Sequence, residues 1–140
     1  MIILDTNVLS ELMRPSPSLK VVGWIAKHSG PELFTTSITE AEIFYGIELL
    51  TKGKRREELL AAADAMFAED FAGRIFGFES DTARAFSKIA AQRRTLGRPI
   101  SHADAQIAAI AQTRKAKLAT RNIADFEGCG IDVVDPWMSP

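Results

Sequence analysis

The first seven residues place the strongest constraint on the fold. Residues 2–4 are Ile-Ile-Leu, an apolar run without polar alternation, and Asp5, Thr6 and Asn7 follow directly. A strand of this composition is typical of a parallel sheet that helices cover on both faces. Ligands of such sheets bind at the carboxyl ends of the strands, so we expect Asp5 to lie where a functional site forms.

Further short apolar segments alternate with helical patterns along the chain, without repeats or a long linker. This alternation predicts an α/β fold: one domain over residues 1–140, a mostly parallel sheet of four to five strands, and helices on both faces. Strands are expected at Ile2–Leu4, Leu33–Thr35, Arg74–Phe78, Lys117–Thr120 and Ile131–Val134. Helices are expected from Asp5 to about Met13, at Leu19–Lys27, Ser37–Leu50, Arg55–Ala68 and Asp81–Leu96, and from Ser101 to about Thr113. The two helices on either side of Gly53 are predicted to form a helical hairpin.

Composition says more about the compartment of the protein than about its chemistry. The single Cys129 cannot form an internal disulfide, and the chain has no long apolar run or signal-peptide pattern. We therefore expect a soluble cytoplasmic protein without a membrane segment. A net charge of −1 gives no overall basic field, so contact with nucleic acid would depend on local patches of Lys and Arg.

Three further acids occupy places comparable to that of Asp5. Glu42, Asp104 and Asp125 each follow a short turn or lie in the first turns of a helix after a predicted strand. Carboxylates that converge at one edge of a sheet make an all-oxygen site suited to Mg²⁺ or Mn²⁺. The four acids therefore predict a cation site.

Asp104, Asp125 and the nearby Glu40 also have a purely structural interpretation. Ser37 and Glu40 match a helix capping box, and Ser101 with Asp104 matches a second one. Asp125 lies in a predicted loop, where an aspartate is by default a turn residue. Glu40 is assigned to the cap, whereas the set of four acids favours function over capping for Asp104.

The ordered motifs resemble those of PIN-domain ribonucleases, in particular the VapC/FitB-like toxins of type II toxin-antitoxin modules. The resemblance extends from Met1 to about Trp137 and rests on four segments: the strand followed by Asp5-Thr6-Asn7, Thr39–Ile43 with Gly46, Asp104–Ala109, and Thr120–Phe126. It implies a three-layer α/β/α fold and a metal-dependent endoribonuclease. It also implies a cognate antitoxin, an RNA substrate and a homodimer.

The resemblance assigns roles to individual residues. It implies that Asp5, Glu42, Asp104 and Asp125 bind Mg²⁺ or Mn²⁺ and catalyse hydrolysis of RNA phosphodiesters by metal-activated water. The residues expected to support the site are Thr6, Asn7, Thr120 and Asn122.

Basic side chains near the acids are candidates for binding the RNA backbone. They are Arg121, which follows a strand, and Arg93, Arg94 and Arg98, which precede the Asp104 helix. For the last three, a solvated helix end is an equally good interpretation. His102 is expected to point outward. A dimer surface is predicted on the early helices, from the apolar residues Leu9, Leu12, Met13, Phe44 and Ile47.

Three other classes of protein fit the sequence less well. A phosphotransferase that begins with a strand and Asp needs a second Asp two positions later, where this chain has Asn7. A receiver domain needs a Lys after a late strand, where this chain has Thr120-Arg121. The intact set of acids disfavours a catalytically idle binding module. A DNA-directed PIN-like nuclease stays the main alternative. A contact with the 2′-hydroxyl would distinguish RNA from DNA, and no residue of the sequence indicates such a contact.

Overall fold

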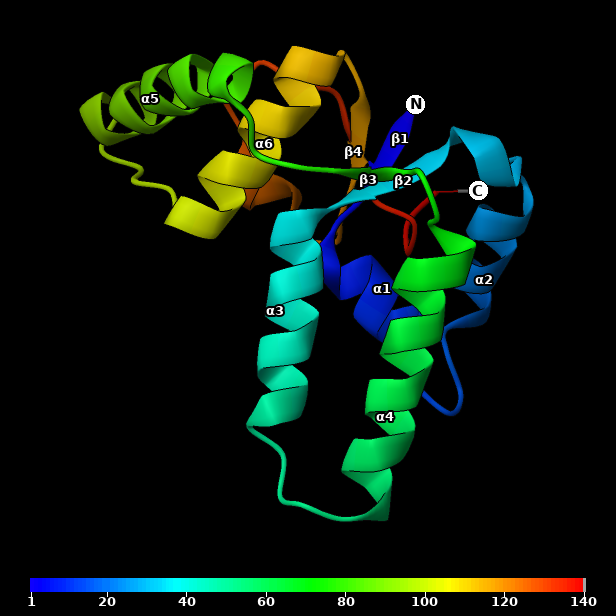
Figure 1. Ribbon diagram of the computed structural model, residues 1–140. Helices are drawn as coiled ribbons and strands as arrows, with labels where there is room; N and C mark the ends of the chain where they lie inside the picture. Colours follow the sequence, from blue (N-terminus) through cyan, green and yellow to red (C-terminus); the bar gives the residue numbers. More distant parts are fainter. Residues whose placement is uncertain (140) are drawn as a thin grey trace.

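The computed structural model describes residues 1–139 and contains one five-stranded sheet in which every pair of neighbours is parallel. The strands are β1 (Ile2–Leu4), β2 (Leu33–Thr36), β3 (Ile75–Phe76), β4 (Lys117–Ala119) and β5 (Val133–Val134). Their order across the sheet is β3-β2-β1-β4-β5, so β1 is the central strand. The predicted number and direction of the strands are confirmed (Figure 1).

Six α-helices connect the strands, as predicted. They are α1 (Thr6–Leu12), α2 (Leu19–Ala26), α3 (Ser37–Glu48), α4 (Lys54–Ala65), α5 (Ser80–Thr95) and α6 (His102–Arg114). Short helical turns are η1 (Gly30–Glu32), η2 (Met66–Asp70) and η3 (Ile123–Phe126). Helices α3 and α4 form the predicted hairpin and extend away from the sheet (Figure 1). An ion pair of 2.7 Å between Glu48 and Arg56 links them.

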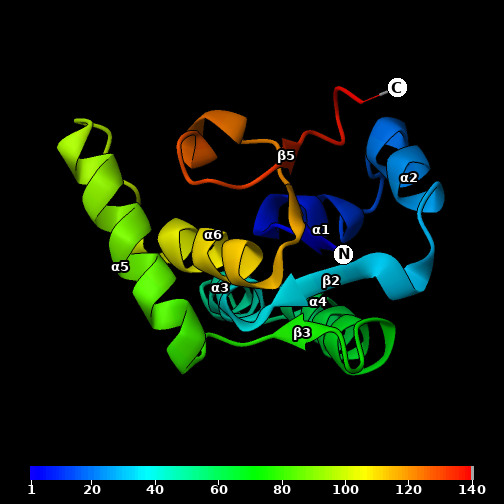
Figure 2. The ribbon, with the colours of Figure 1, turned by 90° about the horizontal axis from the view of Figure 1, so that it is seen from above.

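The sheet separates two hydrophobic cores, which makes the fold a three-layer α/β/α structure. Ile2 and Leu4 pack with α1 to α4, whereas Ile3 points to the opposite face and packs with α5 and α6. This opposition follows from the alternation of side chains along a strand. Figure 2 shows α5 on one side of the molecule and α2 on the other, with the strands between them.

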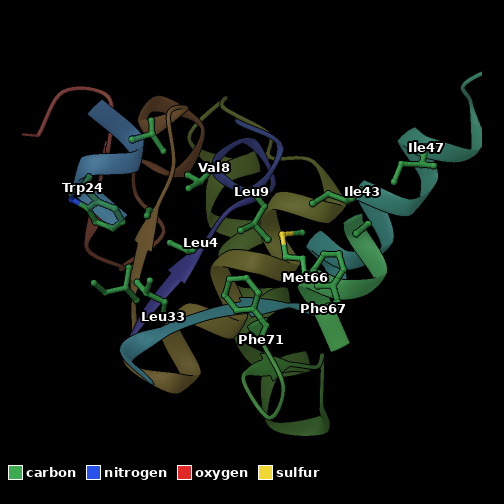
Figure 3. Packing of buried hydrophobic residues seen from close by; sticks show 14 residues of the cluster. Leu4, Val8, Leu9, Trp24, Leu33, Ile43, Ile47, Met66, Phe67 and Phe71 are labelled. Atoms are coloured by element: carbon green, nitrogen blue, oxygen red, sulfur yellow. The ribbon is translucent and has the colours of Figure 1, made fainter. Parts of the chain in front are cut away.

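Side chains from distant parts of the sequence close the first of these cores. Figure 3 shows Leu4 of β1 and Leu9 of α1 in the same cluster as Met66 and Phe71 from the end of the hairpin. The second core is built largely from α6, whose residues 107–111 are all buried. A helix with so wide an apolar surface belongs between other elements.

Two predicted strands are longer than the observed strands by two or more residues. The strand expected at Arg74–Phe78 is limited to Ile75–Phe76, and the strand expected at Ile131–Val134 is limited to Val133–Val134. These strands, β3 and β5, are the two edge strands, and each forms hydrogen bonds with one neighbouring strand.

The helix expected at Arg55–Ala68 also has different bounds. It starts one residue earlier, at Lys54, and leaves the α conformation after Ala65. It continues as a π-helical turn over Met66–Asp70. The wider turn brings Met66 and Phe67 into the first core, where both are buried.

The capping box predicted at Ser37 and Glu40 is also wrong. The N-cap of α3 is Thr36, whose Oγ1 accepts a hydrogen bond of 3.1 Å from the backbone N–H of Thr39. Thr36 still belongs to β2, so the helix begins directly where the strand ends. The cap predicted at Ser101 is confirmed, since its Oγ accepts a hydrogen bond of 3.1 Å from the N–H of Asp104.

The predicted dimer surface is partly contradicted. Leu9 is fully buried and Ile47 is 5% exposed, because both belong to the first core. Leu12, Met13 and Phe44 are half-buried against the same core. The exposed apolar side chains in this region are instead Tyr45 of α3 and Leu49, which caps its carboxyl end. No helix within residues 1–139 has the length and apolar character needed to cross a membrane.

Candidate functional site

Asp5 lies at the carboxyl end of the central strand and is held by four hydrogen bonds. Its backbone N–H donates to the carbonyl of Ala119 at 2.9 Å. Its Oδ1 caps α1 by accepting from the N–H of Thr6 at 2.8 Å. Its Oδ2 accepts from Thr120 Oγ1 at 2.8 Å and from Asn7 Nδ2 at 3.2 Å. The carboxylate is therefore fixed in position while only 4% of the residue is exposed.

The charge of Asp5 is incompletely compensated. Burial raises the pKa of its carboxyl group above the ordinary value, the hydrogen bonds from Thr120, Thr6 and Asn7 oppose the change, and the charge of Glu42 adds to it. None of these partners is a cation. The site therefore holds a negative charge that a bound cation would stabilise.

Thr120 and Asn7 form the polar floor beneath Asp5. The Thr120 hydroxyl donates to Asp5 and accepts from Asn7 Nδ2 at 3.0 Å and from the N–H of Asn122 at 3.1 Å. Asn7 Oδ1 accepts from the N–H of Arg121 at 3.0 Å. These bonds join the start of α1 to the loop after β4 and orient Asp5.

Glu42 approaches from the hairpin. Its Oε1 accepts a hydrogen bond of 2.7 Å from Thr6 Oγ1, which lies 3.1 Å from the hydroxyl of Thr39. Glu42 is exposed on its helix, so water can reach its carboxylate. The Thr6 contact turns it toward Asp5.

Asp104 lies in the first turn of α6, half-buried, and faces the other acids. Burial, the charge of Asp5 and, to a smaller extent, the charges of Asp125 and Glu42 together raise its pKa to about 6, against the opposing hydrogen bond with Ser101. A residue that served only as a helix cap would not experience three neighbouring carboxylates. The cap and the acidic cluster therefore coexist at Asp104.

One cleft of about 520 Å³ collects most of the predicted site. Its lining includes Asp5, Glu42 and Asp104 together with Thr6, Asn7, Asn122 and Arg121. Thr120 is buried beneath the cleft. Asp125 is exposed and does not line it; among the described residues it reaches the cluster through its charge alone.

The donor set fits a hydrated divalent cation. No group of three or more Asp, Glu, His or Cys side chains within residues 1–139 is close enough to hold a metal by itself. Mg²⁺ does not require such a cage, since it keeps several waters and takes one or two carboxylates. Asp5 and Asp104 both line the cleft, and the charge of Asp5 raises the pKa of Asp104, so these two carboxylates could hold the ion together.

The structure corrects the role predicted for Arg93. This residue is only 5% exposed, and its guanidinium donates to the backbone carbonyls of Arg98, Asp125 and Glu127 at 2.7–3.0 Å. It holds α5 to the segment around η3 and cannot reach substrate. The sequence did not distinguish it from its exposed neighbour Arg94.

The other predicted basic residues differ in position. Arg121 lines the cleft. Arg98 is half-exposed and pairs with Glu127 at 2.8 Å, and Arg94 is exposed on α5; neither lines the cleft. Four residues of the cleft were missed by the sequence analysis: Glu11, Arg14, Ser10 and Trp137. The spacing of Glu11 and Arg14 in one helical turn was an available signal for the first two.

Comparisons with known proteins agree with this geometry. The PIN-domain family model matches residues 2–127. The chain is 36% identical to VapC ribonuclease Y4jK of Sinorhizobium fredii over 98% of both chains. It is also 36% identical to the toxin FitB of Neisseria gonorrhoeae, over 98% of this chain and 99% of FitB.

A solved structure extends the comparison to three dimensions. The structure of FitAcB from Neisseria gonorrhoeae superimposes with a TM-score of 0.92 at 35% identity, covering 99% of this chain and 100% of the other. The predicted resemblance is thereby confirmed over nearly the whole sequence. The chain belongs to the PIN-domain family, beside the VapC ribonucleases and the FitB toxin.

Proposed function

We propose that the protein is a metal-dependent endoribonuclease and the toxin of a toxin-antitoxin module. The observation that carries the proposal is the convergence of Asp5, Glu42 and Asp104 on one cleft, in a chain 36% identical to a VapC ribonuclease. The site residues, the use of Mg²⁺ or Mn²⁺ and the choice of RNA belong to this proposal.

The residues of the cleft have different roles in phosphodiester hydrolysis. A divalent cation at Asp5 and Asp104 would supply an activated water and offset the charge of the phosphate. Thr120, Asn7 and the N–H of Thr6 hold Asp5 in one orientation, so little reorganisation is needed when the substrate binds. Glu42 faces solvent and is oriented by Thr6 to accept a hydrogen bond from water.

A cleavage assay with purified protein tests this function. We expect cleavage of RNA with Mg²⁺ or Mn²⁺ and none in excess EDTA. Asp5→Asn and Asp104→Asn are expected to abolish cleavage, because each removes a charge that would hold the cation. Glu40→Ala is the matched control, since Glu40 lies on the same helix as Glu42 but does not line the cleft. Full activity in EDTA would contradict the mechanism.

The same assay separates RNA from DNA as substrate. Single-stranded RNA and DNA of one sequence are compared at equal concentration, with Mg²⁺ or Mn²⁺. We expect cleavage of RNA alone. Comparable cleavage of the DNA would replace the ribonuclease assignment by the DNA-directed alternative.

Two partners follow from the relatives. FitAcB matches this chain at 35% identity, and a toxin-antitoxin complex from Klebsiella pneumoniae matches it at 25% identity, so we propose a cognate antitoxin for this chain as well. A homodimer is proposed too, although not through Leu9 and Ile47. Induced expression is expected to arrest growth, and coexpression of the cognate antitoxin to restore it. Normal growth on induction of protein that is shown to be intact would count against the toxin assignment.

A further inference from the structure

A buried carboxylate that the proposed mechanism does not use lies in the wall of the cleft. Glu11, in the last turn of α1, is 7% exposed and lines the cleft. Its Oε2 accepts a hydrogen bond of 2.9 Å from the N–H of Ser18, which fixes the turn that contains Pro15 and Pro17. The contact with Ser18 is the main reason that the pKa of Glu11 is lowered. Glu11 is therefore charged near neutral pH.

Glu11 holds one edge of an arginine side chain. Arg14 Nη1 donates to both carboxylate oxygens of Glu11, at 3.3 and 3.5 Å. The Arg14 side chain as a whole is 66% exposed. Its Nε and Nη2 make no hydrogen bond to any residue in the described range 1–139, yet Arg14 lines the same cleft as the acids. Its remaining donors are therefore available to a ligand in the cleft.

Arg121 lies on the same wall and is also held in place. Its backbone is tied to Asn7, and its guanidinium lies over the ring of Trp137, 5.0 Å from the centroid. Its charge contributes to the lowered pKa of Glu11, so the two arginines approach the same carboxylate. The three groups together carry one net positive charge beside an acidic cluster.

We propose that Arg14 and Arg121 form a phosphate clamp that holds the backbone of the substrate beside Asp5, Glu42 and Asp104, with Glu11 as the positioning residue for Arg14. The inference rests on the proposed function and deepens it by naming the groups that bind the substrate. The planar guanidinium presents its donors in a geometry that matches phosphate oxygens. Glu11 fixes one edge of Arg14, which leaves the other edge directed to the ligand at a smaller loss of side-chain freedom.

Charge explains why the cleft needs such a clamp. A phosphodiester that approaches three carboxylates is repelled by them at distances of several ångströms. Two guanidiniums that line the same cleft offset this repulsion and favour one path for the backbone. Because the Arg14 side chain is largely exposed, its ion pair with Glu11 contributes little to stability. Its position in the cleft gives it a use in binding.

Equilibrium binding of a short fluorescent single-stranded RNA tests the clamp independently of catalysis. Binding is measured in EDTA over a series of salt concentrations, where no cleavage is expected. Arg14→Gln is expected to weaken binding about tenfold at low salt and to reduce the slope of log K against log salt by about 0.7, the value for one phosphate contact on a single strand. Arg14→Lys is expected to restore the slope but only part of the affinity, because a lysine cannot bond Glu11 and a phosphate with two separate edges.

Arg84→Gln is the matched control. Arg84 is exposed on α5 and does not line the cleft, and its substitution removes the same charge. We expect its affinity and salt slope to equal those of the wild type. An equal loss of affinity in Arg84→Gln and Arg14→Gln would show that only overall charge matters, and the clamp would be rejected.

The wild-type assays distinguish this inference from the proposed function. If the wild type cleaves RNA but Arg14→Gln keeps the wild-type affinity and salt slope, the clamp is wrong and the ribonuclease stands. If the wild type binds RNA through Arg14 without cleaving it with Mg²⁺ or Mn²⁺, the activity is wrong and the clamp stands. If it neither cleaves nor binds, both fail.

Discussion

At the scale of the residue, one carboxylate serves both the fold and the site. Asp5 caps α1 with Oδ1 and receives Thr120 and Asn7 at Oδ2. The sequence was sufficient to identify Asp5, because a strand that ends at an acid is a local pattern. It was insufficient for Arg93 and Arg94, which are adjacent in sequence but buried and exposed respectively. The difference depends on carbonyls about thirty residues away, which no local pattern records.

The raised pKa of Asp104 makes the stability of the metal-free protein depend on pH. Its value is about 6 in the folded chain against an ordinary 3.8, so its ionisation disfavours the folded state as pH rises through this interval. We expect Asp104→Asn to stabilise the metal-free protein at neutral pH by about 1–2 kcal/mol, less than the full shift implies because solvent screens a half-buried group. Near pH 4 the two proteins are expected to melt alike.

Thermal melting in EDTA at the two pH values checks this expectation. Asp64→Asn, an exposed substitution on α4, serves as the control and is expected to change the melting temperature little at either pH. A lower melting temperature for Asp104→Asn at neutral pH would mean that the favourable first-turn charge outweighs the repulsion from the other acids.

At the scale of the element, connections between helices and loops position the acids. Arg93 joins α5 to the segment that carries Asp125, and Thr36 begins α3 directly at the end of β2. The sequence predicted the elements well because the apolar patterns are local. It placed the α3 cap one residue too late, since Ser37 and Thr36 are both good caps and the register of β2 decides between them.

Arg93 supplies the prediction at this scale. Replacing it with Met is expected to lower the free energy of unfolding by about 2–4 kcal/mol, because three part-buried hydrogen bonds to the carbonyls of Arg98, Asp125 and Glu127 lose their donor. Arg94→Met, exposed on the same helix, is expected to change it by less than about 0.5 kcal/mol. Urea denaturation of both variants provides the measurement, and equal values for the pair would remove the structural role of Arg93.

At the scale of the whole molecule, the acidic cluster draws on several distant elements. Asp5 follows β1, Glu42 lies on α3 and Asp104 on α6, so a cation bound among them would join both cores across the sheet edge. The sequence predicted parallel strands and two helical layers, and these are confirmed. It did not provide the order β3-β2-β1-β4-β5, because nothing local specifies which strands become neighbours.

This arrangement predicts global stabilisation by the metal. At a Mg²⁺ concentration a hundredfold above its dissociation constant, the free energy of unfolding is expected to rise by about 2.7 kcal/mol. Asp5→Asn is expected to lose most of this increase, while the Asp64→Asn control keeps it. Denaturation with and without Mg²⁺ measures the increase. An equal increase in both variants would place the bound ion elsewhere.

The central position of β1 also governs when the cleft can come into existence. A ribosome makes the amino-terminal strand first, but β1 pairs with β4 only after residues 117–119 exist, and the Asp5 carboxylate receives its bond from Thr120 a residue later. A nascent chain that ends before Lys117 therefore lacks β4, and one that ends before Thr120 lacks the hydroxyl that bonds the Asp5 carboxylate. Translation products that end before Thr120 therefore cannot assemble the cleft with Asp5 held in this way.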